Sequence, residues 1–206
     1  MIKYVIFDFD GTIADSKKAI VSSWNHLADK YNYKEISFEE LDDLKKLSMK
    51  ERSRLLNFPL IKLPVVMPEL YKLFLKARHQ VKLFDGMKEV LSELESKGYK
   101  VIIISSNSKE NIQAFLEHNR INNVTKVICS SSIFGKDKLI RKFLRETRLK
   151  TSEVIYVGDE HRDLIACKKA GVKMIWVSWG YDSIEVLKSA KPDYKVYTPA
   201  EILEVI

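Results

Sequence analysis

Cysteine, proline and glycine are all scarce in this sequence, with two, five and seven occurrences among its 206 residues. Cys129 and Cys167 are far apart and form neither a Cys-x-x-Cys nor a His–Cys spacing, which argues against a disulfide framework and against a structural zinc site. We expect both to be small core residues. The sequence also lacks internal repeats and low-complexity linkers.

Long hydrophobic runs are absent as well. No apolar run approaches the roughly 18 residues that a membrane-spanning helix needs. The N-terminus Met1-Ile2-Lys3 leads directly into a strand pattern and shows none of the features of a signal peptide. We therefore expect a cytoplasmic protein that makes no use of a membrane.

Positive charge exceeds negative charge, and the formal net charge is +7. Much of the excess falls in residues 136–150, at a helical spacing that predicts a solvated helix face. A nucleic-acid groove is the alternative, and we disfavour it. With 46% hydrophobic and 31% charged residues, the composition is that of an ordinary soluble protein with room for one α/β domain and a modest insertion.

The most informative stretch is an apolar run, Tyr4 to Phe7, that ends in two carboxylates, Asp8 and Asp10, followed by Gly11. The run predicts a strand buried on both faces, as in a parallel sheet, and glycine permits a sharp turn after it. Two neighbouring carboxylates repel each other unless a cation lies between them, and a hard cation such as Mg²⁺ accepts oxygen ligands. The alternative is a simple Asx turn at a strand end.

Strand and helix patterns alternate through most of the chain, which predicts an α/β fold with a Rossmann-like parallel sheet. Residues 15–84 show only helical patterns, interrupted by Pro59, Pro64 and Pro68 at predicted short connections. We therefore expect a core of residues 1–14 and 85–206, with an all-helical cap, 15–84, inserted after the first strand. Further strands are predicted at 99–104, 124–129, 153–157, 173–178 and 193–197.

Three more groups of polar residues follow predicted strands or precede predicted helices. Ser106-Asn107 offers a hydroxyl and backbone N–H groups to an anion, although Ser105 is a competing choice and a helix cap at Ser108 is the simpler interpretation. Lys136 begins a basic helix in which Lys138 is an alternative.

The last group is Gly158-Asp159 with Asp163 four residues later. Acidic residues at a helix N-terminus also have a purely structural use, because they interact favourably with the helix dipole. The carboxyl ends of parallel strands share one edge of the sheet, however, so all four groups are predicted to converge there.

Together, Asp8-Phe9-Asp10-Gly11-Thr12, Ser106-Asn107, Gly135-Lys136 and Gly158-Asp159-x-x-x-Asp163 resemble, in order, the four motifs of the haloacid dehalogenase superfamily. The resemblance covers essentially the whole chain and is closest to the phosphoglycolate phosphatase and β-phosphoglucomutase branch. It implies the fold of that superfamily, with a helical cap, and a phosphatase that acts on a small phosphorylated metabolite.

The resemblance also implies roles for individual residues. Asp8 is the nucleophile that forms an aspartyl-phosphate, and Asp10 is the general acid and base. The Mg²⁺ ion is held by Asp8, the Asp10 carbonyl and Asp159, while Asp163 acts through water or positions Lys136. The residues expected to bind substrate or hold its phosphate are Gly11, Thr12, Ser106, Asn107, Lys136 and, from the cap, Lys50.

Several alternatives stay open at this stage. A phosphosugar mutase would need a basic cap residue after Ser48, where the sequence has Met49; Lys50 or Arg52 are the substitutes. A regulatory protein with a vestigial site is a further alternative. Mn²⁺ fits the same ligands as Mg²⁺. We expect a monomer because no heptad pattern is visible, and the sequence does not name the substrate.

Overall fold

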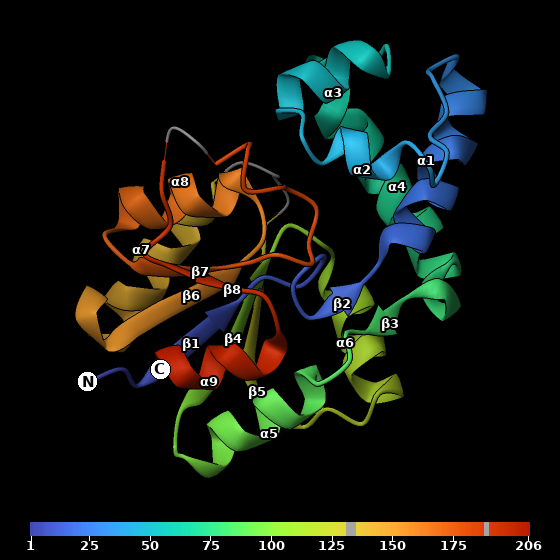
Figure 1. Ribbon diagram of the computed structural model, residues 1–206. Helices are drawn as coiled ribbons and strands as arrows, with labels where there is room; N and C mark the ends of the chain where they lie inside the picture. The colour runs from blue at the N-terminus through green and yellow to red at the C-terminus, as the bar shows by residue number, and fades with distance from the viewer. Residues whose placement is uncertain (131–134, 188–189) are drawn as a thin grey trace.

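The core is built on a sheet of six parallel strands (Figure 1). The structure, a computed structural model, describes residues 1–130, 135–187 and 190–206. In sheet order the strands are β5 (Val124–Cys129), β4 (Lys100–Ser105), β1 (Tyr4–Phe7), β6 (Val154–Gly158), β7 (Lys173–Val177) and β8 (Tyr194–Val196). The predicted α/β fold is confirmed, and each of the six predicted strands is present within one or two residues at either end.

The central strand β1 sets the relative positions of the segments that leave the sheet at its carboxyl edge. It pairs in parallel with β4 on one side and β6 on the other, so that Phe7 lies opposite both Ile103 and Val157. Its residues alternate between two apolar layers, with Val5 and Phe7 facing one and Ile6 facing the other. Because the three strands end in register, the segments that follow them emerge side by side.

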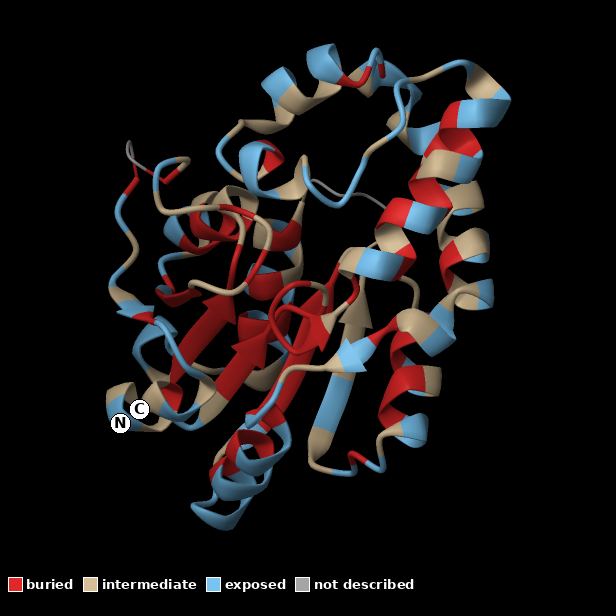
Figure 2. Cartoon of the chain, turned by 45° about the vertical axis from the view of Figure 1, so that its right-hand side comes forward, coloured by how far each residue is buried: buried red, intermediate tan, exposed pale blue. Residues whose placement is uncertain are grey.

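Helices cover both faces of the sheet, whose strands are mostly buried (Figure 2). On the face of Val5 lie α5 (Met87–Ser96), α6 (Lys109–His118) and α9 (Ile202–Val205). On the face of Ile6 lie α7 (Lys136–Thr147) and α8 (His161–Ala170). Short 3₁₀ turns at Thr151–Glu153 and Pro199–Glu201 precede β6 and α9. No helix in the described ranges is long and apolar enough to cross a membrane.

The cap is a separate group of helices beside the carboxyl edge of the sheet (Figure 1). It consists of α1 (Lys17–Tyr31), α2 (Leu41–Leu44), α3 (Met49–Leu55) and α4 (Leu63–Lys76), with 3₁₀ turns at Leu60–Lys62 and Arg78–Gln80. These helices have their own small apolar core, which includes Trp24, Leu27, Phe58 and Val66. A capping box is present at the start of α3, where Ser48 and Glu51 bond reciprocally.

Two features of the cap differ from the sequence-based expectation. Ala14–Asp15 forms a short strand, β2, that pairs antiparallel with β3 (Lys82–Leu83). The predicted cap region is therefore not wholly helical, and α1 begins only at Lys17. The two segments pair because the chain leaves the core and re-enters it at one place. This ribbon joins the cap to the core.

The second difference concerns two prolines, which were predicted to interrupt the helical pattern but lie within α4. Pro64 is in the first turn, where its missing N–H group has no intrahelical partner to lose. Pro68 removes one helical hydrogen bond. The helix continues past it because Val66 and Phe74 are buried against the cap and the core.

Candidate active site

The turn after β1 directs two carboxylates to different partners. Asp8 is only 3% exposed and its Oδ1 accepts the N–H of Phe9 at 2.7 Å. The carboxylate of Asp10 accepts hydrogen bonds from Ser16 Oγ at 2.7 Å and from Asn107 Nδ2 at 2.8 Å. Gly11 has φ of +79°, and a Cβ there would lie 2.4 Å from Asp159 Oδ2. Glycine is therefore required at this position both by conformation and by space.

Lys136 joins the first motif to the fourth. Its buried Nζ lies 2.6 Å from Asp8 Oδ2 and 2.6 Å from Asp163 Oδ1. Burial lowers the pKa of Lys136, but Asp163 and Asp8 outweigh that effect and hold the pKa above its ordinary value, so the ammonium stays charged. The competing candidate Lys138 is exposed on the same helix and lies outside this group.

The residues after β4 line a cavity together with Asp8 and Asp10. Ser105 is buried and its Oγ accepts the N–H of Asn107 at 3.0 Å, so this hydroxyl is used within the loop. Ser106 is half-buried in the cavity wall, and its carbonyl accepts a hydrogen bond from Tyr71 of the cap. Both serines line the cavity, so the choice of Ser106 over Ser105 stays a prediction.

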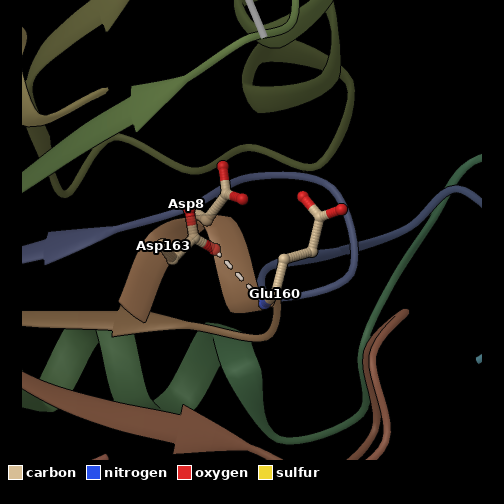
Figure 3. A group of neighbouring side chains, drawn as sticks. All are labelled: Asp8, Glu160 and Asp163. Atoms are coloured by element: carbon tan, nitrogen blue, oxygen red, sulfur yellow. Dashed lines mark hydrogen bonds between the residues drawn. The ribbon is translucent and has the colours of Figure 1, made fainter. Parts of the chain in front are cut away.

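Three carboxylates approach closely enough to share a cation. Oxygen atoms of Asp8, Glu160 and Asp163 lie within 4.8 Å of one another (Figure 3). Asp163 also accepts from Lys136 and, at 3.3 Å each, from Tyr156 Oη and the Glu160 N–H. The sequence analysis did not identify Glu160 as a member of this group. Its place directly after Asp159 is the signal that could have indicated it.

Asp159 lies beside this group, and its carboxylate has other partners. Oδ1 accepts the hydroxyl of Thr12 at 2.8 Å, and Oδ2 accepts the N–H of Tyr181 at 2.7 Å. The expected ligand set of Asp8, Asp10, Asp159 and Asp163 therefore differs from the group that the structure assembles. Gly11 and Thr12 were expected to bind substrate, but they lie outside the cavity lining: Gly11 makes the turn and Thr12 holds Asp159.

Burial raises the pKa values of three carboxyl groups in the site, those of Asp8, Asp10 and Asp159. Desolvation raises the pKa of Asp8 to about 8, although Lys136 opposes the shift. Burial also raises the pKa of Asp10, with Ser16 and Asn107 opposing it, and the pKa of Asp159, where Glu160 adds to the effect. The carboxylates of Asp8, Asp10, Asp159, Glu160 and Asp163 lie near the cations Lys136 and Arg162, which are also buried.

A segment after β7, residues 179–183, connects the site to the cap, and sequence reasoning did not identify it. Trp179 Nε1 donates to the carbonyl of Thr12 at 3.1 Å. The hydroxyl of Tyr181 lies 2.6 Å from Ser16 Oγ. Ser16 donates its one proton to Asp10, so Tyr181 donates to Ser16. A Cβ on Gly180 would lie 2.1 Å from that of Asp159, so only glycine permits this approach.

On the cap side, the expected substrate ligand Lys50 is exposed and does not line the cavity. Its alternative, Arg52, does line it, but its guanidinium donates to the carbonyl of Leu44 at 2.7 Å and to Asp182 Oδ1 at 2.5 Å. The role of Lys50 therefore stays a prediction without support from this geometry. Lys50 is the second residue of α3 and its side chain is exposed.

Comparison with known proteins agrees with this geometry. Residues 5–177 match the family model described as haloacid dehalogenase-like hydrolase. The chain belongs to this family. It is 28% identical over 203 residues to a phosphoglycolate phosphatase of Synechococcus elongatus, covering 98% of this chain and 96% of the relative. It is 23% identical over 211 residues to the pyrophosphatase PpaX of Bacillus mycoides, covering 100% and 97%.

Among solved structures, a predicted phosphatase from Clostridium acetobutylicum superposes with a TM-score of 0.83 at 25% identity, covering 99% of each chain. The resemblance drawn from four short motifs is confirmed, and so is the prediction of a hydrolase with this fold. The roles of individual site residues stay predictions.

Proposed function

We propose that this protein is a Mg²⁺-dependent phosphatase that hydrolyses a small phosphate monoester through an aspartyl-phosphate on Asp8. The observation that carries the proposal is the placement of Asp8 and Asp10 in the wall of one cavity, with Lys136 2.6 Å from Asp8. The relatives named as phosphatases support the reaction class. A cytoplasmic monomer acting on a metabolite is the setting that the sequence predicts.

The donor atoms at the site fit a divalent cation. Carboxylate oxygens are the ligands that Mg²⁺ prefers, and Asp8, Glu160 and Asp163 bring them within 4.8 Å of one another. A divalent charge would also offset the excess of carboxylates at the site. Asp8 and Asp163 both lie 2.6 Å from Lys136, so this contact does not choose between them. Following the family resemblance, we assign the metal to Asp8, the Asp10 carbonyl and Asp159, with Glu160 beside them, and give Asp163 the role of positioning Lys136.

Bound there, Mg²⁺ would supply positive charge that reduces the repulsion between Asp8 and the phosphate. The Asp8 carboxylate attacks phosphorus, and the leaving oxygen takes a proton from Asp10. The raised pKa of Asp10 favours the protonated form needed for this step. Asp10 then removes a proton from the water that hydrolyses the aspartyl-phosphate. Ser16 and Asn107 hold the carboxyl group in place for both transfers.

The phosphate would be bound by the loop after β4. The Ser106 hydroxyl and the N–H groups near the start of α6 are hydrogen-bond donors at a helix N-terminus, an arrangement that favours anions. Lys136, adjacent to Asp8, neutralises part of the charge that develops during transfer. The mutase alternative is disfavoured because Lys50 lies outside the cavity and Arg52 is paired with Asp182.

Release of phosphate from p-nitrophenyl phosphate, with and without Mg²⁺, tests the proposal. We compare the wild type with Asp8→Asn and with a control variant, Asp43→Asn. Asp43 lies on the exposed surface of the cap. We expect Mg²⁺-dependent turnover in the wild type and in the control, and none in Asp8→Asn. Turnover that survives Asp8→Asn, or that does not depend on a divalent cation, would reject the mechanism.

A further inference from the structure

The cavity above Asp8 and Asp10 has a polar floor and an apolar roof. Its volume is about 270 Å³, near the lower end of the roughly 300–1,000 Å³ typical of small-molecule pockets. The floor consists of core residues, among them Asp8, Asp10 and Ser106. The roof comes from the cap and includes Ile20, Leu41, Leu44, Met67, Leu70 and Phe74.

This roof is a composite surface. Ile20 lies in α1, Leu41 and Leu44 in α2, and Met67, Leu70 and Phe74 in α4, so three helices turn apolar side chains toward the same space. The cap has its own apolar core around Trp24 and Phe58, which does not involve these residues of α2. The apolar roof therefore faces the position where the proposed reaction places the alcohol of the substrate.

The polar groups that the cap adds to the wall have partners within the protein. Arg52 is paired with Asp182, and Tyr71 donates to the carbonyl of Ser106. Lys17 donates to the Trp179 carbonyl at 3.2 Å, and its Nζ lies 5.7 Å from the centre of the Phe84 ring. Lys45 lies 3.5 Å from Asp42. In the described part of the chain, the cap wall thus has its cations already engaged.

A polar alcohol would lose its hydration in such a space and gain few hydrogen bonds. A carboxylate would have to compete with Asp182 for Arg52, with Asp42 for Lys45, or with the Trp179 carbonyl for Lys17. An apolar alcohol has few hydrogen bonds to water to lose on entry, and each CH₂ group that it buries adds about fourfold to the binding constant. The chemistry of the roof therefore selects against the acid of phosphoglycolate and against the hydroxyls of a sugar.

We infer that the substrate is a phosphate monoester of a compact, largely apolar alcohol, such as a branched chain or a single carbocyclic or aromatic ring. This inference rests on the proposed function, since it assigns the leaving group of that reaction. The phosphate lies on the floor and the apolar body contacts α2 and α4. Selectivity then comes from desolvation and shape, without a charged contact to the leaving group.

A matched pair of substrates tests the inference. Cyclohexylmethyl phosphate and glucose 6-phosphate are both primary alkyl phosphates on a six-membered ring, and they differ mainly in ring hydroxyls and ring oxygen. We expect kcat/KM at least about tenfold higher for the carbocyclic compound. A second pair, isobutyl phosphate and 2-phosphoglycolate, should show the same preference. Equal rates, or a preference for the polar member, would overturn the inference.

A pair of methionine variants locates the preference. Met67 is half-buried in the roof, and Met49 is half-buried outside it, so Met67→Gln introduces an amide of similar size into the cavity and Met49→Gln does not. The ratio of kcat/KM for the two ring phosphates should fall severalfold in Met67→Gln and stay at the wild-type value in Met49→Gln. If the ratio of kcat/KM for the two ring phosphates were unchanged in Met67→Gln, the apolar roof would not be the source of the substrate preference.

Acetyl phosphate tests the phosphatase activity separately from the preference for an apolar leaving group, because its acyl group is too small to depend on contacts with the apolar roof. Asp8-dependent hydrolysis of acetyl phosphate together with a preference for glucose 6-phosphate would overturn the apolar assignment and leave the phosphatase intact. Absence of Asp8-dependent hydrolysis of every compound would reject the proposed function, and the assignment of its leaving group with it.

Discussion

Arg52 of the cap lies 2.5 Å from Asp182 of the core, measured from Nη2 to Oδ1. The same guanidinium donates to the carbonyl of Tyr181 at 3.2 Å, and the second oxygen of Asp182 accepts the N–H of His161 at 2.7 Å. A second contact between the two parts runs from the Ser183 N–H to the carbonyl of Lys45 at 3.1 Å. The cap is therefore held over the cavity by residues that also adjoin the carboxylates of the site.

Asp182→Asn should weaken this contact while keeping the shape of the side chain. The amide oxygen can still accept the N–H of His161, but the charge facing Arg52 is lost. Hydrogen bonds to charged groups are worth about 1.5–3 kcal/mol, so we expect about a tenfold loss of kcat/KM for substrates that need the cap. Amide hydrogen exchange in α2 and α3 should become faster.

The matched control for this variant is Asp43→Asn, which breaks an exposed ion pair with Lys46 in the same cap. Exposed pairs contribute little, about 0–1 kcal/mol, so exchange and kinetics should stay close to wild type. If Asp182→Asn behaved like Asp43→Asn, the cap would not depend on the contact with Arg52.

Tyr181→Phe should alter the acid–base behaviour of Asp10 from a distance. Tyr181 donates to Ser16, and Ser16 donates to Asp10, whose pKa this hydrogen bond lowers. Without the tyrosine hydroxyl, Ser16 becomes a weaker donor and the pKa of Asp10 rises further. We expect kcat to fall severalfold and the pKa that governs leaving-group protonation to move upward in the pH–rate profile.

Tyr197→Phe is the control for that experiment, because Tyr197 is exposed and remote from the site. A merely structural role of Tyr181 would reduce activity equally at every pH. A pH–rate profile of unchanged shape in Tyr181→Phe would therefore contradict a role in positioning Asp10.

Lys136→Met should be damaging to both stability and activity, because it leaves Asp8 and Asp163 buried without their counter-charge. Breaking a buried ion pair by removing one partner costs about 3–5 kcal/mol, which urea denaturation would measure. Lys138→Met, on the exposed face of the same helix, should change neither. Comparable losses in the two variants would show that Lys136 was the wrong choice between them.

Stability and Mg²⁺ binding should depend on pH through Asp8. Burial raises its pKa from 3.8 to about 8, so the folded protein holds a proton that the unfolded chain has lost. The stabilisation from this group is complete below 3.8 and is lost as pH rises through about 8. Protons and Mg²⁺ compete for the same carboxylate, so apparent Mg²⁺ affinity should rise from pH 6 to pH 8.

Thermal melting at pH 6, 7 and 8, with and without Mg²⁺, measures both effects. The increase in Tm on adding Mg²⁺ should be larger at pH 8 than at pH 6, and this difference should shrink in Asp8→Asn. A Mg²⁺-induced increase in Tm that is the same at all three pH values would contradict the competition.

Local sequence patterns predicted most of the core because buried strands and helix ends each require particular residue types at neighbouring positions. Buried apolar runs predicted the six strands. Gly98 and Gly171, which follow α5 and α8 at φ values of +85° and +73°, are the residue type that commonly ends a helix. The convergence of Asp8, Ser106 and Asp159 followed from the shared carboxyl edge of parallel strands. That step required only that the strands run parallel, and the order of the strands in the sheet was not predicted.

The features that the sequence did not predict depend on contacts between residues that are far apart in the sequence. The 179–183 segment has no local sign that Tyr181 contacts Ser16 and Asp159, residues remote in sequence. Glycine at position 180 was the one available signal, and it is explained only by the neighbouring Asp159. The β2–β3 pairing is likewise set by the closure of the cap, since two-residue strands have no pattern of their own.

The aspartyl-phosphate is the central claim, and intact-protein mass spectrometry tests it most directly. The Asp10→Asn variant is mixed with acetyl phosphate and Mg²⁺, quenched in acid and mapped by peptide. Acetyl phosphate has a good leaving group, so phosphoryl transfer should proceed, whereas hydrolysis lacks its base. The account predicts that one phosphoryl group accumulates on Asp8 and is absent from Asp8→Asn. Phosphate found on Ser106, or none on the protein while turnover continues, would contradict it.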